Sequence, residues 1–174
     1  MWMRQPTAEF RLLKGEGNRR ALRSLVVRRP PGLLAYEAGE PVAWVAVAPR
    51  EDYVRLENSR VLEPVPGERV WAAPCFFVKP SHRGRGLTLA LLRAAAAFAR
   101  RHAAGSLEGY PTTNRAQPQA PAFVHTGFES TFRRAGFREI ARRSPTRPIL
   151  RRDFGSRSAT GAPRARAEKA RTRG

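Results

Sequence analysis

Two closely spaced glycines beside arginines form the segment whose residue types are best suited to bind a ligand. Residues 78–88 read VKPSHRGRGLT, in which Gly84 and Gly86 alternate with Arg83 and Arg85. Glycine lets a backbone approach a ligand closely, and the first turn of a helix presents N–H groups with partial positive charge. An apolar stretch precedes the segment and an alanine-rich stretch follows it. The sequence therefore predicts a diphosphate site between a strand and a helix.

Two better-known phosphate-binding motifs fit this segment less well. The GxxxxGK[ST] pattern of a P-loop occurs nowhere in the chain, so a P-loop is excluded. A dinucleotide-binding fold stays open as the weaker alternative, because Gly84 follows a predicted strand and Glu108 lies 22 residues after Gly86. Against this alternative, Leu89 stands at the third glycine position, and the chain after Pro111 is short for repeated βαβ units.

The other reactive side chains show no pattern typical of a covalent or metal-dependent site. Cys75 is the single cysteine, which excludes an intramolecular disulfide. It lies in an apolar stretch, so we interpret it as a small buried hydrophobic residue rather than a nucleophile. No metal site is predicted, because the three histidines lack metal-ligand spacing; they are His82, His102 and His125.

The chain is strongly basic: 33 basic and 14 acidic residues give a formal net charge of +19. Such a field attracts phosphates, nucleic acid or anionic surfaces. However, 30 of the basic residues are arginine, a bias that a GC-rich genome produces without selection for any partner. The charge alone therefore does not establish nucleic-acid binding.

Length and hydropathy predict one domain followed by a basic tail. A chain of 174 residues corresponds to one domain of ordinary size. From Gly155 onward no large apolar residue occurs, so residues 1–154 are expected to form the domain and 155–174 a disordered basic tail. No apolar run approaches the roughly 20 residues of a membrane span. The first ten residues also lack the apolar region of a signal peptide, so we expect a cytoplasmic protein without a membrane partner.

Hydrophobic periodicity and turn residues predict an alternation of strands and helices. The long helix after Gly86 is expected to bury Leu87, Leu91, Ala94 and Phe98 and to end at Gly105. The expected elements are a helix over 18–27 capped by Asn18, a hairpin over 33–36 and 42–48, mostly loop over 50–69, a strand over 70–78 that bulges at Pro74, the long helix, a strand over 106–110, a loop over 111–121, a short helix over 129–135, and two strands over 137–142 and 148–154.

Two motifs in this arrangement resemble those of the GNAT superfamily of N-acetyltransferases. Residues 83–88, RGRGLT, resemble its acyl-CoA signature, although Thr88 stands where glycine or alanine is usual. Downstream, Phe132, Gly136 and Phe137 resemble the Tyr-x-x-x-Gly-Phe motif at the end of the family's fourth helix. The resemblance implies an α+β fold of the GNAT α/β/α type. In that fold a central, mostly antiparallel mixed sheet splays into a V and is flanked by helices.

The resemblance also implies acetyl-CoA as co-substrate, lying in the V between the strand that ends at Val78 and the strand that begins near Ser106. Its pantetheine arm would pair with the backbone of the first strand, whose N–H groups would polarise the thioester carbonyl. An uncharged amine would attack directly, so no enzyme nucleophile is required. The residues expected to bind the cofactor are Phe76, Phe77, Val78, Arg83, Gly84, Arg85, Gly86, Leu87, Thr88 and Phe132.

The acid and the base of the reaction are less well defined by this resemblance. Ala72 stands where family members often carry a glutamate base, and Phe132 stands where they carry the general-acid tyrosine. Glu108 is the best remaining carboxylate, either as a base acting through water or as a structural hydrogen-bonding group. Tyr110 lies on the same strand face as Glu108. There it either contacts the substrate or the thiol, or only packs against other side chains. We expect Glu108 and Tyr110 to be the catalytic residues, while His125 lies either near the pantetheine or on a surface loop.

Two functions of different classes are compatible with these residues. The first is an N-acetyltransferase that moves the acetyl group of acetyl-CoA to a primary amine of a small molecule or protein, by direct attack in a ternary complex. The second is a CoA-binding, catalytically weak basic protein that associates with nucleic acid or the ribosome, which the replaced residues Ala72 and Phe132 favour. CoA release that depends on an acceptor distinguishes them. We expect a monomer or a homodimer.

Overall fold

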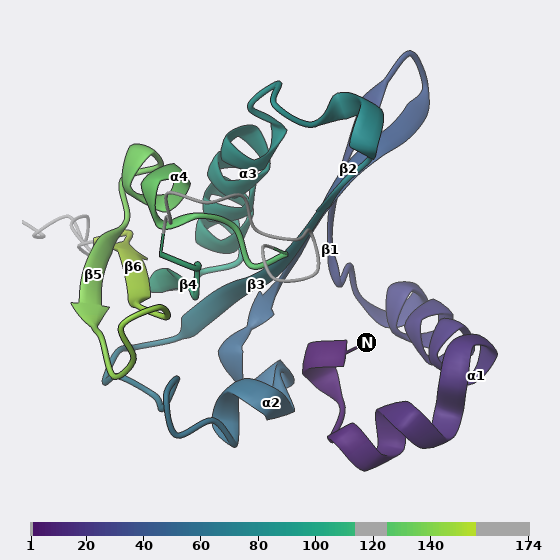
Figure 1. Ribbon diagram of the computed structural model, residues 1–174, viewed down its shortest axis with the longest axis horizontal. Helices are drawn as coiled ribbons and strands as arrows, with labels where there is room; N and C mark the ends of the chain where they lie inside the picture. Colours follow the sequence, from purple (N-terminus) through teal and green to yellow (C-terminus); the bar gives the residue numbers. More distant parts are fainter. Residues whose placement is uncertain (1, 114–124, 156–174) are drawn as a thin grey trace, which may run out of the picture.

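The computed structural model describes residues 2–113 and 125–155, and within them a six-stranded mixed sheet is flanked by helices (Figure 1). The strands are β1 (Gly32–Glu37), β2 (Glu40–Pro49), β3 (Val70–Val78), β4 (Ser106–Gly109), β5 (Arg138–Ala141) and β6 (Ile149–Asp153). Their order is β1-β2-β3-β4-β6-β5, and every neighbouring pair is antiparallel except β3 with β4. This confirms the predicted α+β fold with a mostly antiparallel mixed sheet.

Two of the four helices of the described residues fall where the sequence pattern predicts them, one begins earlier than predicted, and one short helix lies in the stretch predicted to be mostly loop. They are α1 (Thr7–Arg28), α2 (Val54–Glu57), α3 (Leu87–Arg101) and α4 (Glu129–Arg134), with the short 3-10 turns η1 (Trp2–Arg4), η2 (Arg50–Asp52) and η3 (Pro80–His82). None of them combines the length and apolar character that a membrane span needs. The loop predicted over 111–121 is described only as far as Thr113, and the predicted tail lies outside the described residues apart from Gly155.

The hairpin of β1 and β2 and the bulge in β3 are both confirmed. The hairpin turns at Ala38 and Gly39, whose φ angles of +49° and +83° have the signs that a tight two-residue hairpin turn requires. Further along β2, Ala46 faces Cys75 and Ala48 faces Ala72, so β3 carries one extra residue between these pairs. That extra residue lies next to Pro74, which has no N–H to donate to a ladder.

Strands β3 and β4 separate after a short paired stretch. Their register covers only Val70–Ala72 against Ser106–Glu108, although β3 continues to Val78. The carboxyl-terminal half of β3 therefore has an edge that β4 does not cover, and this is the opening that the predicted V shape requires. Both strands approach this opening with their carboxyl ends, because they are parallel.

Helix α3 covers one face of the sheet, and its buried stripe matches the predicted one only in part (Figure 1). Of the predicted face, Leu91 is buried, Leu87 and Phe98 are partly buried against the core, and Ala94 is exposed. The buried residues are Leu91, Leu92, Ala95, Ala96 and Ala99, a stripe rotated toward the small side chains, which allow close approach to the sheet. The helix also ends earlier than predicted, because Ala103 rather than Gly105 adopts the left-handed conformation, at φ +59°.

Helix α1 begins at Thr7, well before the predicted start at Asn18, and Figure 1 shows it at the edge of the molecule on the same side as α2. It buries no residue and is kinked at Lys14, where φ is +48°. Asn18 is not its cap: the side-chain amide donates to the carbonyls of Phe10 and Lys14 at 2.8 and 2.6 Å, across the kink. The Asn18 side chain thereby replaces part of the backbone hydrogen bonds that the kink interrupts.

Candidate functional site

The glycine-rich segment forms an open turn between β3 and the first residue of α3. Gly84 and Gly86 have φ angles of +75° and +78°, a conformation that strains any other residue. No atom lies within 4 Å of the position that a Cβ would take at either glycine, so the space beside them is open. The N–H groups of Leu87 and Thr88 lie in the first helical turn, where no intrahelical acceptor exists. The arrangement is suited to bind an anion.

The arginines of this turn have different surroundings. Arg83 donates from Nε to the carbonyl of Val78 at 3.2 Å, which holds its side chain against the end of β3. Arg85 is half exposed and lies 3.4 Å from Glu37, at the end of β1. Glu37 also accepts a hydrogen bond of 2.9 Å from His82 Nε2, while His82 Nδ1 lies 2.8 Å from the hydroxyl of Ser81. The predicted anion site thus includes a competing carboxylate.

Sequence reasoning missed Glu37 and His82 as members of this site. Glu37 is 48 residues from Arg85, and no local pattern links the two. The available signal was indirect. The hairpin turn at Gly39 places the end of β1 beside the start of β2, and the start of β2 pairs with the end of β3. Only this complete strand order brings Glu37 to the turn.

The predicted cofactor residues of β3 point in different directions. The ring of Phe77 is 54% exposed and lies on the face that α3 does not cover, in register with Trp44 of β2. Phe76 and Val78 pack on the α3 side instead. The backbone N–H of Phe76 points to the uncovered edge, since it donates to the carbonyl of His125 at 2.6 Å.

A short segment of the chain itself, residues 125–128, therefore lies along the edge of β3. It is also joined to the residues after β4: Thr112 donates to the carbonyl of Gly127 at 2.9 Å, and Thr112 and Phe128 form a parallel bridge. His125 is thus placed beside the predicted thioester position by its backbone. A thioester carbonyl can accept from the N–H of Phe76 only when the His125 carbonyl has moved away.

Glu108 lies in a buried network of charges rather than on an open surface. Its side chain is 1% exposed. One oxygen accepts from Arg151 Nε and Nη2 at 3.1 and 2.6 Å, and the other accepts from the Tyr110 hydroxyl at 2.7 Å. Arg50 Nε lies 3.4 Å from that second oxygen. Both oxygens are therefore engaged, which favours the structural role among the two that the sequence left open.

The two arginines of this network also fix the loop before β3. Arg151 donates to the carbonyls of Val65 and Pro66, each at 2.7 Å. Arg50 donates to the carbonyl of Leu62 at 2.6 Å and pairs with Glu57. A single buried carboxylate thereby organises two guanidinium groups, and these hold the 62–66 loop against β4 and β6.

Tyr110 lies on the same side of β4 as Glu108, as predicted, and is also buried. Burial, and then the negative charge of Glu108, raise the pKa of its hydroxyl well above the ordinary value. The hydroxyl therefore stays protonated and acts as a donor to Glu108. Ala72, the position of the family's usual base, is the cross-strand neighbour of Glu108 and is fully buried.

Phe132 is fully buried, whereas Cys75, predicted to be a buried residue, is only partly buried. The Phe132 ring is buried edge-on to Phe76 and Phe137, with centroids 6.0 and 5.2 Å apart, and it lies so close to Gly109 that a Cβ there would be 1.8 Å from its Cε1. Burial raises the pKa of the Cys75 thiol, which disfavours the thiolate that a nucleophile needs. Among the described residues, no group of three or more His, Cys, Asp or Glu side chains could hold a metal ion.

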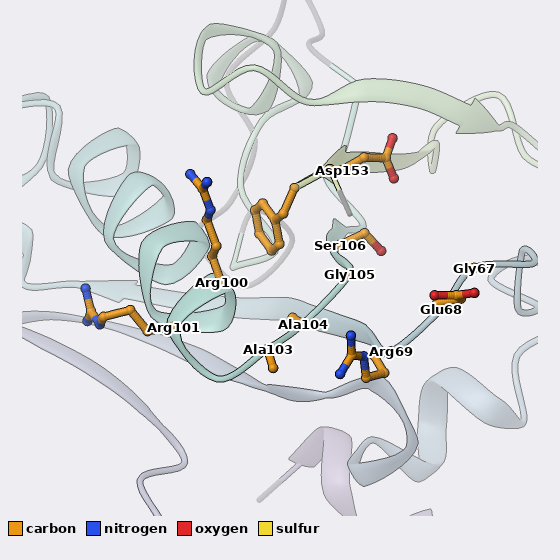
Figure 2. A pocket seen from close by; sticks show the side chains of 12 residues that line it. Gly67, Glu68, Arg69, Arg100, Arg101, Ala103, Ala104, Gly105, Ser106 and Asp153 are labelled. Carbon is orange, nitrogen blue, oxygen red and sulfur yellow. The ribbon is translucent and has the colours of Figure 1, made fainter. Parts of the chain in front are cut away.

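A cavity of about 350 Å³ lies at the other end of α3 from the glycine-rich turn (Figure 2). It is lined by residues before β3, at the end of α3 and at the ends of β4 and β6, and includes none of the predicted site residues. Figure 2 shows the side chains of Arg69, Arg100 and Arg101 pointing in different directions rather than converging. This hollow is therefore not assembled as an anion site.

Comparisons with known proteins relate the chain to one family. The model of the Acetyltransferase (GNAT) family matches residues 2–128. A ribosomal-protein-alanine N-acetyltransferase from Brucella melitensis is 18% identical, with 79% of this chain and 77% of that chain covered and a TM-score of 0.52. For a putative GNAT-family acetyltransferase from Desulfovibrio desulfuricans, the identity is 17%, the coverage is 77% of each chain and the TM-score is 0.50.

Other matches are more partial. The GNAT domain of S. lividans PAT is 23% identical over 71% of this chain, with a TM-score of 0.44, and the match spans 60% of the length of that domain. None of the curated proteins matches the chain significantly. The identities are low, so the solved structures support the fold and leave the substrate open.

Proposed function

Because the chain belongs to the acetyltransferase (GNAT) family, we propose that its reaction is transfer of the acetyl group of acetyl-CoA to a primary amine, within a ternary complex. The observation that carries this proposal is the open turn before α3. Its two left-handed glycines leave space for a diphosphate, its first-turn N–H groups can donate to one, and Arg85 adds positive charge. In this proposal residues 83–88 bind the diphosphate of acetyl-CoA.

The acyl transfer itself needs an amine, a polarised thioester and a departing thiol. The amine nitrogen attacks the thioester carbon, and the tetrahedral oxyanion then collapses with cleavage of the C–S bond. We assign the N–H of Phe76 as a donor to the carbonyl oxygen, because it points to the uncovered edge of β3 and becomes available when the carbonyl of His125 moves. A thiol pKa of about 8.5 makes CoA a good leaving group, so the position of Phe132 needs no acid.

The amine must also lose a proton, since alkyl amines are mostly protonated at neutral pH. Within the described residues, Glu108 has both oxygens engaged and is separated from solvent. We therefore assign Glu108 and Tyr110 to holding the end of β4 in place and solvent to accepting the proton. Relay by Glu108 through water is the alternative, and the Glu108→Gln variant distinguishes the two.

The test is a screen of amines for acceptor-dependent release of CoA, detected with a thiol reagent, together with the thermal stability of the protein in acetyl-CoA. We expect acetyl-CoA to raise the melting temperature and at least one amine class to release CoA above the rate of hydrolysis. Absence of any acetyl-CoA effect would contradict the proposal.

A CoA-binding protein that associates with nucleic acid or the ribosome is the second candidate. Helix α1 favours it: within the described residues, five arginines of this exposed helix have one ion pair among them, Arg19 with Glu16; they are Arg11, Arg19, Arg20, Arg23 and Arg28. Retained acetyl-CoA binding without acceptor-dependent release in the same screen would favour this candidate over the transferase.

The carboxylate of Glu37 gives a first quantitative prediction. It pairs with Arg85 and its charge opposes that of a diphosphate in the turn, so Glu37→Gln is expected to tighten acetyl-CoA binding roughly two- to fivefold, the range of exposed ion pairs. Isothermal titration at low ionic strength measures this. Glu40→Gln, in the same hairpin but paired with Lys79, is the matched control for the change in net charge. Equal or weaker binding in Glu37→Gln than in the control would contradict the assignment.

A further inference from the structure

Arg147 lies in the connection between β5 and β6, which passes beside the residues that follow β4. The connection is joined to those residues by two bonds of Thr113, to the carbonyls of Thr146 and Pro145, at 3.1 and 3.2 Å. Arg147 Nη1 lies 3.3 Å from the carbonyl of Tyr110 and 3.4 Å from the hydroxyl of Thr126. Thr126 directly follows the residue whose carbonyl binds the N–H of Phe76. Arg147 is therefore close to the proposed reaction centre.

The charge of Arg147 is not neutralised by the part of the chain that the structure describes. Its two hydrogen-bond acceptors are neutral oxygens, and no carboxylate of residues 2–113 or 125–155 pairs with it. Two nearby arginines differ: Arg142 pairs with Glu129 and Glu139, and Arg151 pairs with Glu108. Residues 114–124, NRAQPQAPAFV, lie outside the described ranges and contain no acidic side chain.

A partly buried guanidinium without a counter-charge is unfavourable, because burial removes hydration that only an anion or several acceptors can replace. Burial accordingly lowers the pKa of Arg147. A guanidinium has five N–H donors, and both hydrogen bonds described for Arg147 use Nη1. Its remaining donors have the planar geometry that matches the two oxygens of a carboxylate.

We propose that Arg147 binds a carboxylate of the acceptor, so that the preferred acceptors are small amines that carry a carboxylate a few bonds from the amine. This rests on the proposed transferase function and adds the substrate class to it. The carboxylate would take the place beside Tyr110 and Thr126, and the amine would then extend toward the N–H of Phe76. The net charge of +19 also draws anionic acceptors to the protein.

Paired acceptors test this proposal in the full-length protein. The standard amino acids are compared with their carboxamides, which keep the amine and remove the negative charge, in the CoA-release assay. We expect the best carboxylate acceptor to exceed its amide about tenfold in kcat/KM. Arg147→Gln should abolish this preference through KM, and Arg147→Lys should restore part of it. Arg143→Gln, on the same connection but bound to the carbonyl of Glu63, should keep it.

Binding measurements separate failure of this proposal from failure of the transferase function. The dissociation constant of acetyl-CoA should be unchanged in Arg147→Gln. With CoA present, the N-acetylated product of the best carboxylate acceptor should bind wild type more tightly than Arg147→Gln. If transfer occurs but Arg147→Gln lowers kcat/KM equally for acid and amide, the carboxylate proposal is wrong and the transferase function stands. If no acceptor releases CoA and no amino acid or N-acetyl amino acid binds, both are overturned.

Discussion

Replacing Gly86 with glutamate is expected to weaken acetyl-CoA binding by about 100-fold or more, a change on the order of 2.7 kcal/mol in binding free energy. Gly86 is the N-cap of α3 at φ +78°, and nothing lies within 4 Å of its Cβ position. A glutamate there would place a carboxylate in the space proposed for the diphosphate. Its negative charge would also offset the partial positive charge that the helix N-terminus presents to the ligand.

The melting temperature reports this loss directly. At about 100 times its dissociation constant, acetyl-CoA should stabilise the wild type by roughly 2.7 kcal/mol, which for a domain of this size is a shift on the order of 5–10 °C. In Gly86→Glu at the same ligand concentration, the shift should fall to about 1–2 °C or less. An unchanged shift would show that the cofactor binds elsewhere.

Two controls separate charge from backbone strain at this position. Gly86→Ala introduces the same left-handed strain without charge and should keep most of the acetyl-CoA shift, with a lower starting stability. Gly155→Glu adds the same side chain at another open glycine, with φ +69°, at the end of the sheet away from the turn. It should leave acetyl-CoA binding unchanged.

Most of the fold could be predicted from the sequence because its determinants are local. The apolar runs of β1 and β2, the Gly39 turn and the proline in β3 act on neighbouring residues, and each produced the expected element. The face of α3 was predicted less well. On an alanine-rich helix, the hydrophobic periodicity is compatible with several adjacent faces being buried. The packing against the sheet decides which face is buried.

The site was harder to predict because its contacts are long-range. The turn of Gly84 and Gly86 is visible in eleven consecutive residues, but Glu37 reaches Arg85 only through the strand order. The Phe76 contact with His125 likewise depends on where the chain returns after β4. No pattern in the sequence indicated that Glu108 would lie between two arginines, since Arg50 follows β2 and Arg151 belongs to β6, both far from Glu108 in the sequence.

Glu108→Gln is expected to destabilise the protein by about 3–5 kcal/mol, the usual cost of removing one partner from a buried ion pair. Glutamine keeps the shape of the side chain but not its charge, so Arg50 and Arg151 would remain buried without a counter-ion. With 2–4 °C per kcal/mol for a domain of this size, the melting temperature should fall by roughly 6–20 °C. Thermal or urea unfolding measures the change.

Glu129→Gln is the matched control for this variant. Glu129 also pairs with two arginines, but these are more exposed than the partners of Glu108: Arg133 is 50% and Arg142 is 29% exposed. Exposed ion pairs contribute about 0–1 kcal/mol, so the control should change the melting temperature only slightly. Similar effects of the two substitutions would contradict the view that the buried network stabilises the fold.

The kcat of Glu108→Gln, measured at a temperature where the variant is fully folded, then decides between the two roles of this carboxylate. If Glu108 only holds β4 and the 62–66 loop, kcat should change less than tenfold and its pH profile should keep its shape, because the proton acceptor is solvent. If Glu108 relays the proton, kcat should fall about 100-fold across the pH range with unchanged acetyl-CoA binding, the lower end of general-base catalysis. The engagement of both oxygens by Arg151 and Tyr110 leads us to expect the first result.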